Sequence, residues 1–126
     1  MRSLALIFAL LPLPALAEMP DWWREGAVWA GDGVQTDGQA WTVEIALGPD
    51  AARISYPSIP CSGTLEILAA NASHAKLQET ISSGKQVCIS GGTVLLRAEP
   101  EGKLIFLWSD PASGMEAVAV LAPLAS

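Results

Sequence analysis

Apolar and polar residues alternate in short segments along most of the chain. In the clearest segment, residues 41–47, Trp41, Val43, Ile45 and Leu47 alternate with Thr42, Glu44 and Ala46. Successive side chains of a β-strand point to opposite faces, so this period of two predicts a strand with one buried face. The same period recurs at Leu65 and Ile67, at Leu77, Glu79 and Ile81, at Val94 and Leu96, at Leu104, Phe106 and Trp108, and at Val118 and Val120.

Clusters of glycine, proline, aspartate, asparagine and serine separate these segments. They occupy residues 31–33, 37–38, 48–50, 60–63, 71–73, 82–84, 90–92, 100–102 and 110–114. Turn signals at intervals of roughly 8 to 12 residues are typical of all-β sandwiches and barrels. The segments between them predict about eight strands, and the short connections favour antiparallel pairing because parallel strands need long crossovers.

An antiparallel meander of this kind has two exposed sheet edges unless it closes or folds into two layers. We therefore predict a small all-β, antiparallel β-barrel, with a two-layer β-sandwich as the alternative. The interior of an eight-stranded barrel is just wide enough for side chains or for one small ligand. The sequence does not decide between these two interiors.

Residues 1–17 have the pattern of a secretory signal peptide. Arg2 supplies a short positive start, residues 4–14 are apolar, and residues 15–17 form a small-x-small cleavage site. The apolar core is shorter than the roughly 20 residues of a membrane-spanning helix and contains Pro12 and Pro14. We therefore expect a periplasmic or secreted protein, not inserted in a membrane, with residues 18–126 as a single barrel domain.

The charge balance of the mature chain narrows the range of partners. Removing residues 1–17 takes away Arg2 and leaves 6 basic and 13 acidic residues, a formal net charge of −7 instead of −6. Nucleic acids and anionic membrane surfaces are bound through clustered lysine and arginine. We expect neither as a partner, and we expect a monomer.

The chain contains two cysteines, Cys61 and Cys88. In an exported protein two cysteines most simply form one disulfide. Closing a loop of about 28 residues stabilises a fold by roughly 3 kcal/mol in the chain-entropy model. We predict this disulfide as a staple between neighbouring strands.

Five short motifs follow one another along the chain. They are Trp29-Ala30-Gly31, the run Tyr56-Pro57-Ser58-Ile59-Pro60-Cys61-Ser62-Gly63-Thr64-Leu65, Glu79-Thr80-Ile81 with Gly84, the run Cys88-Ile89-Ser90-Gly91-Gly92-Thr93-Val94, and Leu104-Ile105-Phe106-Leu107-Trp108. This order resembles a small secreted module found as the extracytoplasmic domain of some actinobacterial serine/threonine kinases and as free-standing exported bacterial proteins. The resemblance implies a compact β domain with one disulfide at Cys61 and Cys88, and it implies no activity. The chain lacks a kinase domain, which puts a sensor role in doubt.

Candidates for catalysis are few. A serine nucleophile would need the single histidine, His74, as its base, but His74 lies in a predicted turn and no G-x-S-x-G elbow surrounds a serine. Glu66 and Glu79 are the candidate carboxylate pair, on segments expected to be neighbouring strands. Glutamates in strands usually lie on the solvated face, which disfavours this pair as an acid and base. The chain has one histidine and no C-x-x-C pattern, so it lacks the residue spacing of a metal site. We expect no enzyme, no metal and no cofactor.

Glu79 is the carboxylate of most interest. It shares strand parity with Leu77 and Ile81, which places it inside the sheet if those two residues belong to the core. A buried carboxylate needs a partner, and the candidates are Arg53, Arg97, Tyr56 or a tryptophan N–H. Two roles remain open for Glu79, namely a polar contact that fixes strand register and an anchor for a ligand.

Aromatic residues and one stiff loop complete the candidate binding residues. Trp29, Trp41 and Trp108 are expected in the core or lining a pocket, and Trp22 and Trp23 either cap one barrel end or anchor a protein. Tyr56 starts a segment whose two prolines exclude an interior strand. We predict a non-catalytic protein that binds a small envelope molecule in the barrel or an exported protein at the loop rim. The alternative is an inhibitor of an exported hydrolase that uses the proline-rich loop.

Overall fold

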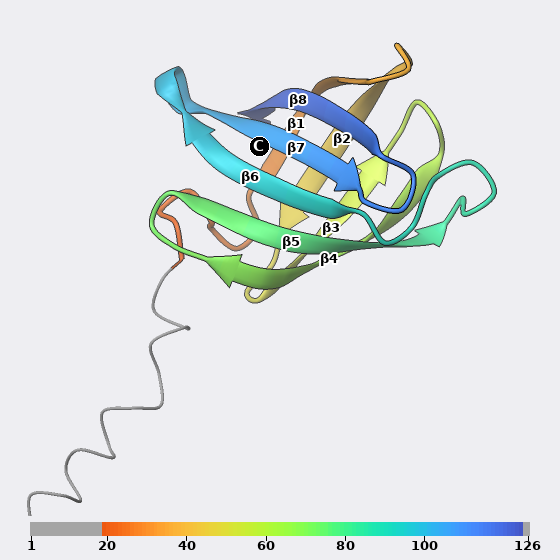
Figure 1. The fold of residues 1–126 in the computed structure, drawn as a ribbon. Helices are drawn as coiled ribbons and strands as arrows, with labels where there is room; N and C mark the ends of the chain where they lie inside the picture. Colours follow the sequence, from red (N-terminus) through yellow and green to blue (C-terminus); the bar gives the residue numbers. More distant parts are fainter. Residues whose placement is uncertain (1–18, 125–126) are drawn as a thin grey trace, which may run out of the picture.

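The computed structural model describes residues 19–124, which form a closed barrel of antiparallel strands (Figure 1). The strands are β1 (Val28–Gln35), β2 (Ala40–Leu47), β3 (Ala51–Tyr56), β4 (Cys61–Ala70), β5 (His74–Ser83), β6 (Thr93–Glu99), β7 (Lys103–Asp110) and β8 (Met115–Pro123), with the short 3-10 turn η2 (Pro100–Gly102) before β7. Each strand pairs with the next, so the predicted eight-strand meander is confirmed. The predicted signal peptide, residues 1–17, lies outside the described residues.

Pairing between β1 and β8 closes the sheet. The register runs from Trp29 opposite Pro123 to Gln35 opposite Ala117. Closure pairs the two edges that an open meander would expose. The barrel prediction is therefore confirmed, and the sandwich alternative is wrong.

Alternation along the strands fills the barrel interior with side chains. In β2 the residues Trp41, Val43, Ile45 and Leu47 are buried, whereas Glu44 faces solvent. Strands β3 to β8 contribute further fully enclosed side chains, among them Ile54, Leu65, Leu77, Ile81, Val94, Leu96, Leu104, Phe106 and Leu121. The barrel is thus a packed core over most of its length.

In β8 the inward residues differ from the sequence pattern. Val118 and Val120 are exposed on the outer face, and the smaller Ala117 and Ala119 point inward with Leu121. The reason is the opposite strand, because Trp108 pairs with Ala117 and Phe106 with Ala119. Two large aromatic side chains leave room only for small residues across from them.

The cluster at residues 31–33, predicted as a turn, lies inside β1. A Cβ on Gly33 would come 2.5 Å from the ring of Trp41, and one on Gly31 would come 2.0 Å from the carbonyl oxygen of Val120. These glycines therefore allow a close approach within the sheet and do not end a strand.

The connections divide between two ends of the barrel. The turns at residues 36–39, 57–60, 84–92 and 111–114 gather at one end, which we call the mouth (Figure 1). The turns at 48–50, 71–73 and 100–102 lie at the other end, together with the segment that precedes β1. This segment packs against that end, because Trp22 and Trp23 contact the core and Trp23 Nε1 donates to the Gly48 carbonyl at 2.8 Å. A cap on one barrel end was one of the two alternatives for these tryptophans.

Candidate functional site

A pocket of about 100 Å³ opens at the mouth. We call it the mouth pocket. Its lining consists of Gln35, Gln39, Trp41, Tyr56, Ile59, Glu79, Ile81, Val87, Cys88, Ile89, Trp108 and Met115. Strands β1, β2, β3, β5, β7 and β8 all contribute, so the site exists only in the closed barrel.

The floor of the mouth pocket is formed by Glu79 and two hydrogen-bond donors. Tyr56 stands at the last position of β3 and Trp108 near the end of β7, so both side chains point inward close to the mouth. The Tyr56 hydroxyl donates to Glu79 Oε2 at 2.5 Å, and Trp108 Nε1 donates to Oε1 at 2.9 Å. Glu79 itself is only 1% exposed. The predicted inward position of Glu79 is therefore confirmed.

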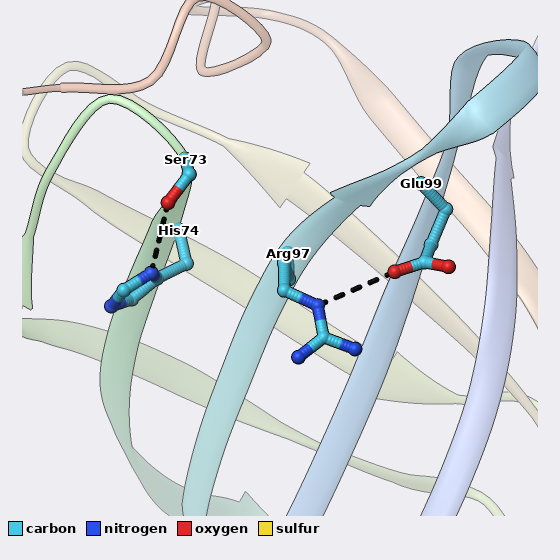
Figure 2. A network of polar contacts seen from close by, with 4 residues as sticks. All are labelled: Ser73, His74, Arg97 and Glu99. Atoms are coloured by element: carbon cyan, nitrogen blue, oxygen red, sulfur yellow. Dashed lines mark hydrogen bonds and ion pairs between the residues drawn. The ribbon is translucent and has the colours of Figure 1, made fainter.

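Two of the four candidate partners for Glu79 do not reach it. Arg53 and Arg97 are exposed on the outer face of the barrel. Within residues 19–124 the one ion pair joins Arg97 to Glu99, at 3.3 Å (Figure 2). Glu79 is thus hydrogen-bonded by neutral donors and faces no cation from the described chain.

Burial governs the protonation of this cluster. Desolvation raises the pKa of Glu79, and the hydrogen bonds from Tyr56 and Trp108 oppose that rise because they favour the carboxylate. Burial, reinforced by the neighbouring charge and hydrogen bond of Glu79, raises the pKa of Tyr56 well above its usual value. Tyr56 therefore remains a neutral donor near neutral pH.

Trp41 forms part of the wall of the mouth pocket. Its Nε1 donates to Gln35 Oε1 at 2.8 Å, which satisfies the buried indole. Its ring meets Tyr56 edge to face, with centroids 5.3 Å apart and planes at 86°. Trp41, Tyr56 and Trp108 together give the pocket an aromatic lining above the carboxyl group.

The long loop at residues 84–92 forms the outer rim. The Cys61–Cys88 disulfide, with Cα atoms 6.4 Å apart, ties this loop to the start of β4. The predicted pairing is confirmed, but it joins a strand to a loop and not two neighbouring strands. The backbone of Glu79 holds the same loop, because Glu79 N donates to the Gly92 carbonyl at 2.8 Å and Gly91 N donates to the Glu79 carbonyl at 3.0 Å.

The sequence-predicted binding residues divide between the two ends of the barrel. Tyr56, Glu79, Trp41 and Trp108 line the mouth pocket. Trp29 lies near the opposite end, opposite Ile45 of β2 and Pro123 of β8. Trp22 and Trp23 cap that same opposite end. The seven residues therefore do not form one site.

Sequence reasoning missed several residues of the pocket. Gln35, Ile59, Ile89 and Met115 line it from turns or strand ends. Ile59 and Ile89 lie in loops, where no period of two applies, whereas Gln35 and Met115 share the inward parity of β1 and β8 at the mouth end of each strand. The run of Val87, Cys88 and Ile89 beside a predicted disulfide was the one usable signal for the rim.

The catalytic candidates lie elsewhere. His74 begins β5 at the end opposite the mouth, where its Nδ1 lies 3.1 Å from Ser73 Oγ (Figure 2). Glu66 and Glu79 do lie on neighbouring strands, as expected, but Glu66 pairs with Gln78 and faces solvent. The two carboxylates point to opposite faces of the sheet, so they do not form a pair around one substrate.

Three further findings bear on the site. Within residues 19–124, no group of three or more histidine, cysteine, aspartate or glutamate side chains is placed to hold a metal ion. No helix in this part of the chain has the length and apolar character needed to span a membrane. No family model, curated protein or solved structure matches the chain. The resemblance to the kinase extracytoplasmic module therefore stays a prediction.

Proposed function

We propose that this chain is a non-catalytic binding protein and that the mouth pocket is its binding site. The observation that supports this most is the enclosed carboxyl group of Glu79 at the floor of an aromatic-lined pocket that opens to the outside. Ligand sites are typically concave and largely apolar, with a few convergent polar groups that set orientation. The mouth pocket has this composition.

A role in stability alone accounts less well for the cluster. An isolated carboxyl group is costly to bury, and replacing a whole buried polar cluster, acceptor and donors together, by apolar side chains of similar volume is often neutral for stability. The deeper barrel layers are apolar, with Ile45, Leu65, Leu77 and Phe106 fully enclosed. Of the two buried polar side chains among the described residues, Glu79 and Asp110, Glu79 lines the pocket where a ligand would meet it.

The chemistry of the pocket supports binding over catalysis. Glu79 and Tyr56 are the two titratable groups in the lining. The raised pKa of Tyr56 disfavours its use as a base near neutral pH. The residues that line the mouth pocket include no serine and no histidine that could act as a nucleophile with them.

The proline-rich loop supports binding over inhibition by a wedge. Ile59 N donates to the Tyr56 carbonyl at 2.9 Å, which makes residues 57–60 a tight turn. The Ile59 side chain is half-buried and lines the pocket. An inhibitory loop would present such a side chain outward to its enzyme.

The proposal includes the compartment. A disulfide is typical of proteins in oxidising surroundings, and Cys61–Cys88 fits the periplasmic or secreted location that residues 1–17 predict. The candidate occupants are a small envelope molecule and a side chain of an exported protein that docks at the rim. The protein itself is proposed to act as a monomer.

A fragment screen by NMR tests the proposed site. The ¹⁵N-labelled protein is titrated with small cationic, neutral and anionic compounds, and the indole N–H signals report position. We expect at least one class to shift Trp41 and Trp108 while Trp22, Trp23 and Trp29 stay unchanged. If no class shifts the two pocket tryptophans, the mouth pocket is not a binding site.

A further inference from the structure

We infer that the mouth pocket recognises a cationic nitrogen, an alkylammonium or guanidinium group at the end of a narrow aliphatic stem. This inference rests on the proposed binding function and names the chemistry of its occupant. It is carried by the hydrogen-bonding capacity of Glu79, the aromatic walls and the small volume of the pocket.

The carboxyl group of Glu79 has unused acceptor capacity. An ionised carboxylate accepts about four hydrogen bonds, and Tyr56 and Trp108 supply one to each oxygen. Both donors are neutral, so neither compensates the charge. A buried carboxylate is stabilised most by a cation that also donates hydrogen bonds. An ammonium offers three hydrogen-bond donors and a guanidinium five. One bound group of either kind would therefore supply both the positive charge and the missing hydrogen bonds.

The aromatic walls favour the same charge. Trp41, Tyr56 and Trp108 line the space above Glu79. Aromatic rings attract cations to their faces, by about 0.5 kcal/mol at exposed sites and about 2 kcal/mol when water is removed. An anionic ligand would be repelled by the charge of Glu79. The net charge of −6 further draws cations toward the protein.

The size of the pocket limits what enters. The mouth pocket has a volume of about 100 Å³. Pockets for whole drug-sized ligands begin at about 300 Å³. The mouth pocket therefore admits the end of a larger molecule. Its rim is apolar at Ile59, Val87, Ile89 and Met115, which suits the methylene stem of such an end group.

Two sources present this chemistry. One is a free amine of the cell envelope, and the other is a lysine or arginine side chain of an exported protein seated on the rim. Both place the same cation against Glu79. They differ in how much of the rim the rest of the molecule covers.

The test compares probes that differ in charge alone. The ¹⁵N-labelled protein is titrated with n-butylammonium chloride, n-butanol and sodium butyrate at matched ionic strength. We expect n-butylammonium to shift the indole signals of Trp108 and Trp41, and to bind at least about tenfold more tightly than the alcohol, as the loss of one charge-assisted hydrogen bond implies. Equal or stronger binding of butanol or butyrate would overturn the inference.

Matched variants assign the effect to Glu79. Glu79→Gln removes the charge at constant size, and Glu66→Gln makes the same change on the outer face of the adjacent strand. We expect Glu79→Gln to abolish the preference for n-butylammonium over n-butanol and Glu66→Gln to preserve it. A preference retained in folded Glu79→Gln would contradict the inference. If Glu79→Gln does not fold, the comparison of the three probes on the unaltered protein still decides.

A peptide identifies the source of the cation. The peptide acetyl-Gly-Lys-Gly-amide is titrated beside n-butylammonium, with norleucine in place of lysine as its control. If the lysine peptide binds more tightly than n-butylammonium, the natural occupant is a protein side chain. If the two bind equally, it is a free amine. Both outcomes support a cation site. Binding of neutral fragments without any binding of cations would leave the proposed function intact and would overturn only this inference.

Discussion

Trp108 and Glu79 meet inside the barrel across a strand that separates them. Trp108 lies on β7 and Glu79 on β5, and β6 pairs with both strands. The indole Nε1 nevertheless reaches Glu79 Oε1 at 2.9 Å through the interior. With Tyr56 from β3, this bond links three non-adjacent strands at one end of the fold. The stability of the mouth therefore depends on a polar contact that no sheet ladder provides.

Replacing Glu79 by an apolar residue tests this dependence. In Glu79→Leu the Tyr56 hydroxyl and the Trp108 N–H lose their acceptor while they remain buried. Each unsatisfied buried group costs about 1–3 kcal/mol, so for the two groups together we expect the free energy of unfolding to fall by roughly 2–6 kcal/mol. Urea denaturation measures the change. Glu66→Leu, on the solvated face, is the control and should change stability by about 0.5 kcal/mol or less. Equal effects of the two variants would contradict the role of Glu79 as acceptor.

The pH dependence of stability carries the signature of Glu79. Its pKa is raised in the folded protein by burial, so between the ordinary glutamate pKa and the raised value the native state binds more protons than the unfolded state. The free energy of unfolding must then fall as pH rises through that window. Glu79→Gln lacks this titration.

We therefore expect the stability of the unaltered protein relative to Glu79→Gln to decrease as the pH rises above about 4.5, the ordinary glutamate pKa, and to level off above the raised pKa of Glu79. Measurements up to about pH 8 keep Tyr56 protonated in both states. Urea denaturation of both proteins at several pH values measures it. Glu66→Gln serves as the reference for loss of a surface charge. A difference that stays constant over this range would show that Glu79 has no raised pKa.

Loss of the disulfide should destabilise the barrel and release the loop at residues 84–92 from β4. The bridge spans a sequence separation of 27, for which the chain-entropy model gives about 3 kcal/mol. We expect Cys61→Ser/Cys88→Ser to lose about that amount in urea denaturation. Amide signals of residues 84–92 should shift most, because Cys88 ties that loop to β4.

The thiol state checks the premise of that experiment. The mass of the intact mature protein, purified from an oxidising compartment, should lie two hydrogens below the fully reduced value. Two free thiols in that sample would refute the bridge and weaken the argument for export.

Gly92 makes room for Trp108. A Cβ on Gly92 would stand 2.3 Å from the Trp108 Nε1 atom, so Gly92→Ala must displace the indole from Glu79. We expect a loss of about 1–3 kcal/mol, typical of overpacking, together with a shift of the Trp108 indole N–H signal.

Gly114→Ala is the comparison for this prediction. Gly114 also lies at the mouth and has a φ of +78°, but a Cβ there meets open space. Backbone strain should cost about 1–2 kcal/mol without moving the Trp108 signal. If both variants leave that signal in place, Gly92 does not position Trp108.

The sequence by itself determined the strands, the disulfide partners and the inward position of Glu79. These follow from the period of two, from the presence of only two cysteines and from the parity of Glu79 with Leu77 and Ile81, all of which are local properties. At β8 the period of two predicted the wrong inner face, Val118 and Val120. Both faces of this strand carry apolar residues, and only the facing Phe106 and Trp108 decide that the alanines turn inward.

Only the tertiary structure decided which aromatic residues share a site. Tyr56, Trp41 and Trp108 meet around Glu79, whereas Trp29, Trp22 and Trp23 lie toward the opposite end. Whether a side chain lies near the mouth or near the opposite end depends on where its strand begins and on which turns gather at each end. Closure between β1 and β8 fixes these positions, and the period of side chains along any single strand carries no information about them.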